Sequence, residues 1–408
     1  MAGRAFRTRG QATATAAVGA MLTHGVPHAV LLAGPRGVGK TTLALDLAAA
    51  LLCRADPIER PCRACRACRA VDHGNHPDLH RLAPVGAGQV IPIGGRDERG
   101  VRDLVAELAL LPVEGGARVA IVEAAHRMTE DAQSAFLKTL EEPPRGATLI
   151  LCADDEERLL PTIRSRTARI RLGPVPRSDV EAIVLERGLG DAAEAARFAR
   201  LASGRPGLAL AYAAAPEAAV IRGEIARAIL DLRSSSRTAR LAGLRDLSGR
   251  AWELVRALDA GTARLAVADG LEAGPAAGAP SVGAASKRRA AGRRSAPSAP
   301  DAEVAEEASD DATPATSVRI PAAERRAGAL ALVGVWRDVL RDLAALVGGE
   351  PRLVRDTSLL DDLEASIGRC DEASIGRALE RLDVAGEQLE GNVSPELVLD
   401  VLALRVAA

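Results

Sequence analysis

Short apolar runs alternate with amphipathic stretches over the first 175 residues of the chain. The runs are rich in Val, Ile, Leu and Ala, which is typical of strands buried on both faces of a sheet. Strands are predicted at 29–33, 118–122, 148–152 and 168–172. Apolar positions at helical spacing predict helices over 42–52 and 129–140. This alternation indicates an α/β domain with a mostly parallel sheet over residues 1–175.

Beyond residue 175 the strand pattern gives way to helical spacing. Helices are predicted from about 178, from 216 to about 265, and again from 323 to 406. The intervening residues 268–322 are dominated by Ala, Gly, Pro and Ser, with a basic cluster followed by an acidic one. Because such a segment cannot bury enough apolar surface to offset its ordering entropy, it is predicted to be a disordered linker and not a DNA contact. We expect a small helical domain over 176–214 and a larger helical domain over 215–408 that this linker interrupts.

Composition excludes some classes of function. The net charge of -1 gives no overall attraction to phosphate backbones, and an aromatic content of 1% argues against a surface that stacks bases. No stretch approaches the roughly 18 apolar residues of a membrane span, and the first residues lack the apolar core of a secretory signal. A cytoplasmic protein without membrane contact is expected.

Residues 34–41 read Gly-Pro-Arg-Gly-Val-Gly-Lys-Thr, which is the full Walker A pattern between a predicted strand and a predicted helix. Glycines let backbone N–H groups approach phosphates, and the start of the helix adds unpaired N–H groups. Lys40 would carry a charge to the β and γ phosphates, and Thr41 a hydroxyl to Mg²⁺. A glycine turn without a ligand is the alternative, which this context disfavours. The residues predicted to bind ATP or ADP here are Gly34, Gly37, Val38, Gly39, Lys40, Thr41 and Thr42.

Four cysteines lie within sixteen residues, at Cys53, Cys62, Cys65 and Cys68. Four thiolates at this spacing suit a closed, tetrahedral Zn²⁺ site of the structural kind, with no open position for catalysis. An iron–sulfur cluster would use the same ligands and remains an alternative. The nearby histidines at 73, 76 and 80 are interpreted as loop residues, because four cysteines already complete the shell. Cys152 and Cys370 are isolated and are expected to be inert.

The strand at 118–122 is followed by Glu123 and Ala124. In many P-loop ATPases an acidic residue here positions Mg²⁺, and a Glu after it orients the attacking water. Glu123 is a candidate for the metal sphere, whereas Ala124 has no group that could orient water. His126 is interpreted as a residue at the start of a helix and not as a replacement base. Nucleotide binding is therefore predicted, with slow or absent hydrolysis.

Four stretches together resemble bacterial clamp-loader subunits of DNA polymerase III. They are the P-loop, the cysteine module (residues 53–68), residues 135–144, which end in Leu-Lys-Thr-Leu-Glu-Glu-Pro-Pro, and residues 160–166. The resemblance covers about residues 5–210 and extends more loosely over the C-terminal helices. It implies an AAA+ domain with an inserted zinc module, a helical lid over 176–214 and an all-α collar over 215–408. It also implies a five-subunit ring with tau/gamma and delta subunits, which places a sliding clamp on primer–template DNA.

In this family a Ser-Arg-Cys motif supplies an arginine finger to the neighbouring subunit's ATP site. Here the motif reads Ser165-Arg166-Thr167, so the resemblance assigns the finger to Arg166. A surface arginine without that role is the alternative. The tau/gamma motor subunit normally has Asp-Glu where this chain has Glu123-Ala124. It also carries an arginine at the place that matches Gly207, where the neighbouring arginine of this chain is Arg205. These departures favour the delta-prime type over the tau/gamma motor, and the motifs disfavour a general AAA+ remodeller such as a helicase loader.

Overall fold

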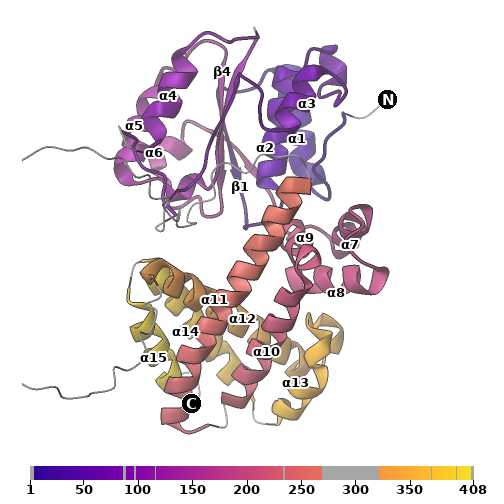
Figure 1. The fold of residues 1–408 in the computed structure, drawn as a ribbon, viewed down its shortest axis with the longest axis vertical. Coiled ribbons are helices and arrows are strands. Elements are labelled where there is room, and N and C mark those ends of the chain that lie inside the picture. The colour runs from indigo at the N-terminus through magenta and orange to yellow at the C-terminus, as the bar shows by residue number, and fades with distance from the viewer. Residues whose placement is uncertain are drawn as a thin grey trace, which may run out of the picture.

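The computed structural model describes residues 4–85, 89–95, 98–114, 116–232, 235–268, 321–368, 370–391 and 393–405. The predicted linker at 268–322 lies almost wholly outside the described residues. The described chain forms a sheet-containing part and a helical part, joined where α9 (Pro206–Ala214) and the end of α11 (Arg237–Ala268) approach the sheet (Figure 1).

The sheet has five parallel strands in the order β2-β3-β4-β1-β5. The strands are β1 (Ala29–Ala33), β2 (Leu79–Leu82), β3 (Arg118–Val122), β4 (Ala147–Ala153) and β5 (Ala168–Arg171). The four predicted strands and the parallel arrangement are confirmed. β2 is an additional edge strand that the sequence pattern did not reveal, because its Leu-His-Arg-Leu run is too short and polar to look apolar.

Helices cover both faces of this sheet, as the alternation of side chains on β1 requires. Val30 and Leu32 pack into one apolar cluster with α2, whereas Leu31 packs into another with α4 and α5. Figure 1 shows α1, α2 and α3 on one side of the sheet and α4, α5 and α6 on the other. These helices are α1 (Ala12–His24), α2 (Lys40–Leu52), α3 (Arg66–Asp72), α4 (Val101–Ala109), α5 (Glu130–Glu141) and α6 (Pro161–Arg164).

The chain is helical from residue 177 onward wherever regular structure is described. One continuous apolar cluster runs from Val175 to Ala403, so the regions expected as lid and collar share a core. The helices are α7 (Arg177–Glu186), α8 (Ala192–Ala202), α9 (Pro206–Ala214), α10 (Pro216–Leu232), α11 (Arg237–Ala268), α12 (Ala322–Val347), α13 (Leu360–Ile367), α14 (Glu372–Glu390) and α15 (Pro395–Arg405). The division into a lid and a collar at residue 214 stays a prediction.

Candidate nucleotide and metal sites

The P-loop connects β1 to α2 in a conformation that depends on glycine. A Cβ at Gly34 would lie 2.2 Å from the carbonyl oxygen of Leu172, on the chain that continues from β5. Gly39 immediately precedes α2 and has a φ of 104°, in the range that side chains disfavour. The loop therefore leaves the carboxyl end of the sheet with the first N–H groups of α2 unpaired, as an anion-binding loop requires.

Lys40 occupies the centre of this loop and is almost completely buried, with 6% exposure. Its Nζ donates to the carbonyl oxygens of Gly34 and Pro35, both at 2.7 Å, and lies 2.6 Å from Oδ1 of Asp154. Thr41 and Thr42 follow, half-buried, at the start of α2. The ammonium thus contacts oxygen atoms that phosphate oxygens can replace.

Asp154 follows β4 and was not identified from the sequence. Because β4 lies between β3 and β1 in a parallel sheet, Asp154 emerges between the P-loop and Glu123. The strand order of the sheet places Asp154 at the candidate site, whereas no motif in its local sequence points to it.

α9 begins against the P-loop. The N–H of Gly207 donates to the carbonyl oxygen of Gly37 at 3.0 Å, which joins the helical part to the loop. The Arg205 side chain donates from Nε to the carbonyl oxygen of Ala202 at 2.8 Å. Burial lowers the pKa of this guanidinium, and the carboxylate of Asp338 on α12 partly offsets the effect. Arg205 is therefore engaged within the helical part.

Two side chains close to Ala124 in the sequence, Glu123 and His126, already have hydrogen-bond partners. The carboxylate of Glu123 accepts from Nε and Nη2 of Arg81 at 2.9 and 2.5 Å. His126 follows in a short 3₁₀ turn, and its Nδ1 accepts from the N–H of Asp154 at 3.2 Å. A neutral imidazole with Nδ1 as acceptor carries its proton on Nε2, so neither nitrogen has a lone pair available for a proton from water. Burial lowers the pKa of His126, which further disfavours its cation.

Arg166 lies at the amino-terminal ends of the strands, whereas the P-loop lies at their carboxyl-terminal ends. It comes just before β5, which is parallel to β1, so it is at the amino ends of the strands. The five residues of β1 separate the two edges by about 16 Å. Nη2 of Arg166 lies 2.8 Å from Oε1 of Glu141, and Nη1 donates to the carbonyl oxygen of Thr162 at 3.1 Å. The side chain is 37% exposed.

The four cysteines of the predicted metal site come together beyond the C-terminal end of α2. Their sulfur atoms all lie within 4.8 Å of one another, with Cys53 Sγ 3.5 Å from Cys62 Sγ and 3.9 Å from Cys65 Sγ. Tetrahedral Zn²⁺ with Zn–S bonds of about 2.3 Å requires sulfur separations of about 3.8 Å, so the arrangement fits the ion. Backbone N–H groups point at three of the sulfurs, from Cys65 to Cys62 and from Cys68 to Cys65, both at 3.4 Å, and from Ala55 to Cys53 at 3.5 Å. Among the described residues, the histidines 73, 76 and 80 lie outside this group.

The thiol pKa values differ within the cluster. Burial acts to raise the pKa of Cys65, but hydrogen bonds from the backbone of Arg54 and Cys68 outweigh it and lower the pKa to about 6. Burial raises the pKa of Cys68 and of Cys53. Thiolates are the metal ligands, so Cys65 is ready to bind near neutral pH, whereas a cation is needed to deprotonate the buried pair.

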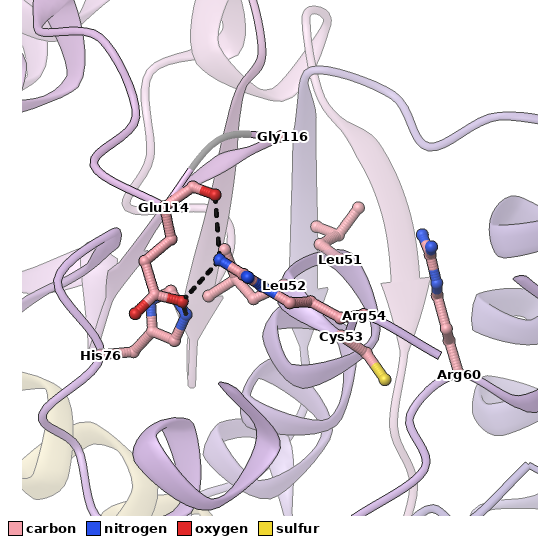
Figure 2. Close-up of a pocket in the computed structure, with 8 residues that line it drawn as sticks. All are labelled: Leu51, Leu52, Cys53, Arg54, Arg60, His76, Glu114 and Gly116. Atoms are coloured by element: carbon pink, nitrogen blue, oxygen red, sulfur yellow. Dashed lines mark hydrogen bonds and ion pairs between the residues drawn. The ribbon is translucent and has the colours of Figure 1, made fainter. Parts of the chain in front are cut away.

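A cavity of about 350 Å³ lies beside the metal group, at the end of α2 away from the P-loop. Figure 2 shows Arg54 reaching across it to Glu114, beside the His76 ring. Nη2 of Arg54 donates to the backbone oxygen and to Oε2 of Glu114, both at 3.0 Å. These contacts tie the loop before β3 to the metal module.

Residues 11–176 match the family model described as DNA polymerase III, delta subunit. The chain is 39% identical over 164 residues to the delta-prime subunit of DNA polymerase III from Pseudomonas aeruginosa, covering 40% of this chain and 48% of that relative. Residues 11–176 are thus similar to clamp-loader subunits of DNA polymerase III. The predicted resemblance to clamp-loader subunits is confirmed for this region.

Other relatives carry two different subunit names. The chain is 35% identical to the Escherichia coli delta-prime subunit, covering 45% of this chain and 54% of that relative. It is 36% identical to the gamma/tau subunit of Mycobacterium bovis, covering 39% of this chain and 26% of that relative. The chain thus spans about half the length of the delta-prime relatives and about a quarter of the gamma/tau relative. Among its described helices, none has the length and apolarity needed to cross a bilayer.

Proposed function

We propose that this chain is a delta-prime-type clamp-loader subunit that binds nucleotide without efficient hydrolysis. ATP or ADP with Mg²⁺ occupies the P-loop, where Lys40 exchanges Asp154 for phosphate oxygens and Thr41 supplies a hydroxyl to the metal. The observation that carries the proposal is that Glu123 and His126, the titratable side chains close to Ala124 in the sequence, both already have partners. Glu123 is paired with Arg81, and the only lone pair of neutral His126 is used by the N–H of Asp154.

Arg166 acts on a neighbouring subunit in this proposal. Its place at the amino edge of the sheet supports that role, because its own P-loop lies at the carboxyl edge. A guanidinium that leaves Glu141 for another subunit's γ-phosphate would stabilise the charge that develops during transfer. The partners are tau/gamma and delta subunits, and the assembled ring loads a sliding clamp on primer–template DNA. α7 to α9 would serve as the lid and α10 to α15 as the collar.

The cysteine group holds one structural Zn²⁺ in this proposal. Four sulfurs close the coordination sphere, so the ion organises the module and has no position for a substrate. Its ligands come from the end of α2 and from the loop and helix that follow, which ties the module to the P-loop helix.

Hydrolysis by reconstituted rings tests the proposal. The purified chain should hydrolyse little ATP alone, and Arg166→Ala should lower turnover at the adjoining site by about a thousandfold or more, without weakening nucleotide binding by this chain. Arg169→Ala is the matched control, because Arg169 is an exposed arginine nearby that pairs with Glu156. Full ring turnover with Arg166→Ala would reject the finger role.

A tau/gamma-type motor is the second candidate. The complete P-loop and the 36% identity to a gamma/tau subunit favour it. Vigorous, clamp- and DNA-stimulated hydrolysis by the isolated chain would select the motor over the delta-prime type.

A further inference from the structure

Arg63 lies inside the metal module, between Cys62 and Cys65, but its side chain points out of the module to other elements. Its backbone φ is 57°, a left-handed conformation that non-glycine residues adopt uncommonly. The two cysteines on either side fix the chain there when they hold a common ion. The side chain is only 15% exposed.

The Arg63 guanidinium joins three segments. Nη2 pairs with the carboxylate of Asp46 in the middle of α2, and Nη1 donates to Oδ1 of Asp72 at 2.6 Å. Nε donates to the carbonyl oxygen of Ala5 at 3.0 Å. One arginine therefore connects the P-loop helix, α3 and the chain before α1.

Asp46 is fully buried, and the N-terminal segment closes over it. Its carboxylate accepts from the N–H groups of Arg7 and Thr8 at 3.0 and 2.9 Å, and from Oγ1 of Thr8 at 2.6 Å. Arg63 provides the only side-chain cation within 4 Å of this carboxylate among the described residues. A buried carboxylate that loses its counter-charge is strongly destabilised, so residues 5–8 depend on Arg63 for their position.

The same segment continues to the nucleotide loop. Gln11 is buried, and its Nε2 donates to the carbonyl oxygen of Val38 at 3.2 Å and to that of Gly173 at 2.6 Å. Val38 belongs to the P-loop, and Gly173 follows β5 beside Gly34. A chain of direct contacts thus runs from the cysteine module through Arg63, Asp46 and residues 5–11 to the phosphate loop.

We propose that metal occupancy of the cysteine site sets the affinity of the P-loop for nucleotide, with Arg63 as the positioning residue that transmits it. The inference rests on the proposed zinc and nucleotide sites and goes beyond them, because it makes the structural ion a regulator of nucleotide binding. With the ion bound, the module holds Arg63 on Asp46 and residues 5–11 hold the loop. Without it, Arg63 is no longer fixed, the N-terminal segment detaches from α2, and fewer molecules have a formed loop. Apparent affinity falls in proportion to the fraction of molecules that are competent to bind.

Calorimetric titration of the full chain with Mg-ATP tests this coupling. Zinc-loaded wild type should bind about tenfold more tightly than metal-free protein, within the usual range of coupling between two sites. Arg63→Ala should retain one zinc and bind ATP as weakly as the metal-free wild type. Arg63→Lys keeps the charge but loses the planar fork, so an intermediate affinity is expected. Arg69→Ala, at an exposed arginine next to the module, should match wild type.

Linkage gives a second readout that needs no catalysis. ATP should raise the equilibrium affinity for zinc by the same factor, measured by competition with a chelator, because coupling is reciprocal. Hydrogen exchange of residues 4–11 should rise in metal-free protein and in Arg63→Ala. Should Arg63→Ala fail to fold, Thr8→Val removes only the Oγ1 contact to Asp46 and should shift the ATP affinity in the same direction.

The outcomes separate this inference from the proposed function. Equal ATP affinity of zinc-loaded and metal-free wild type would overturn the coupling while leaving both sites in place. Loss of ATP affinity on metal removal that Arg63→Ala and Thr8→Val do not reproduce would overturn the role of Arg63. Wild type that holds no zinc, or that binds no nucleotide, would overturn the proposed function and this inference together.

Discussion

Lys40 and Asp154 form an ion pair across the mouth of the P-loop, with Nζ 2.6 Å from Oδ1. The lysine is buried and the carboxylate is about one-third exposed, so the pair is partly shielded from solvent. A triphosphate that enters the loop must replace the carboxylate as the partner of the ammonium, and its own negative charge is repelled by Asp154. The pair would therefore oppose the proposed nucleotide binding until a cation offsets that repulsion.

Asp154→Asn is expected to tighten binding of Mg²⁺-free ATP by roughly tenfold, because a competing negative charge a few ångströms away is removed. The isosteric amide keeps the shape of the loop. The measurement is calorimetric titration with ATP in the presence of a Mg²⁺ chelator. Weaker binding by the variant under these conditions would show that Asp154 contributes to nucleotide binding and does not compete with it.

Lys40→Met tests the other member of the pair. It should lower ATP affinity by about a hundredfold or more, because a hydrogen bond between charged groups contributes about 1.5–3 kcal/mol and the lysine would contact two phosphates. Circular dichroism should show an unchanged fold, since methionine fills the buried space. Unchanged affinity would place the nucleotide elsewhere.

Removal of the metal should destabilise the sheet-containing part of the chain. Cys62→Ser and Cys65→Ser should each reduce zinc below one ion per chain and lower the unfolding temperature by roughly 10 °C, because binding to the folded state is lost. Emission spectrometry and thermal scans measure the two effects. Cys370→Ser is the control, since Cys370 lies between α13 and α14 in the helical part. Full zinc content in both module variants would contradict the four-cysteine site.

Acid should destabilise the protein through His126. Burial lowers its pKa from the ordinary value of 6.5, so the unfolded chain takes up a proton that the folded chain resists. The free energy of unfolding therefore falls as the pH drops below about 6.5 toward the pKa of His126 in the folded chain. Above pH 6.5 this group does not affect it. His76 and His80 have pKa values lowered by burial and act with the same sign.

His126→Asn isolates this contribution, because Oδ1 of asparagine can accept the N–H of Asp154 in place of Nδ1 and does not titrate. Urea unfolding at pH 5, 6 and 7 should show a weaker pH dependence for the variant than for wild type. Parallel pH profiles would mean that His126 is protonated equally in the folded and unfolded chains.

Arg222 and Asp356 form a buried pair in the helical part, each 3% exposed and separated by 2.7 Å. Arg222→Met should lower the free energy of unfolding by about 3–5 kcal/mol, because Asp356 would remain buried without its counter-charge. Arg250→Met is the comparison, since Arg250 pairs with two glutamates at the surface and should change the urea midpoint little. Similar effects of the two substitutions would contradict the assigned burial.

The sequence determined features that depend on neighbours along the chain. Runs of Val, Ile, Leu and Ala predicted β1, β3 and β4, because a strand buried on both faces needs a continuous apolar run. The alternation of Ala168, Ile170 and Leu172 with arginines predicted β5, which is only partly buried. The P-loop and the cysteine spacing predicted where glycine conformations and clustered thiols occur, since residues a few positions apart must lie close in space. The sequence also showed Ala124 at the position where many P-loop ATPases carry a Glu that orients water, because Ala124 comes shortly after a recognisable strand.

The tertiary structure alone decided which charges meet. Asp154 reaches Lys40 because β4 lies beside β1, Arg81 reaches Glu123 because the unpredicted β2 lies beside β3, and Arg63 reaches Asp46 because the metal module folds back over α2. Each pair joins residues from separate elements. The order of strands in the sheet and the path of a long loop cannot be predicted from the sequence around either residue. Charged side chains are also long and occur at many surface positions. Only the tertiary structure therefore shows which of them lie together at the candidate site.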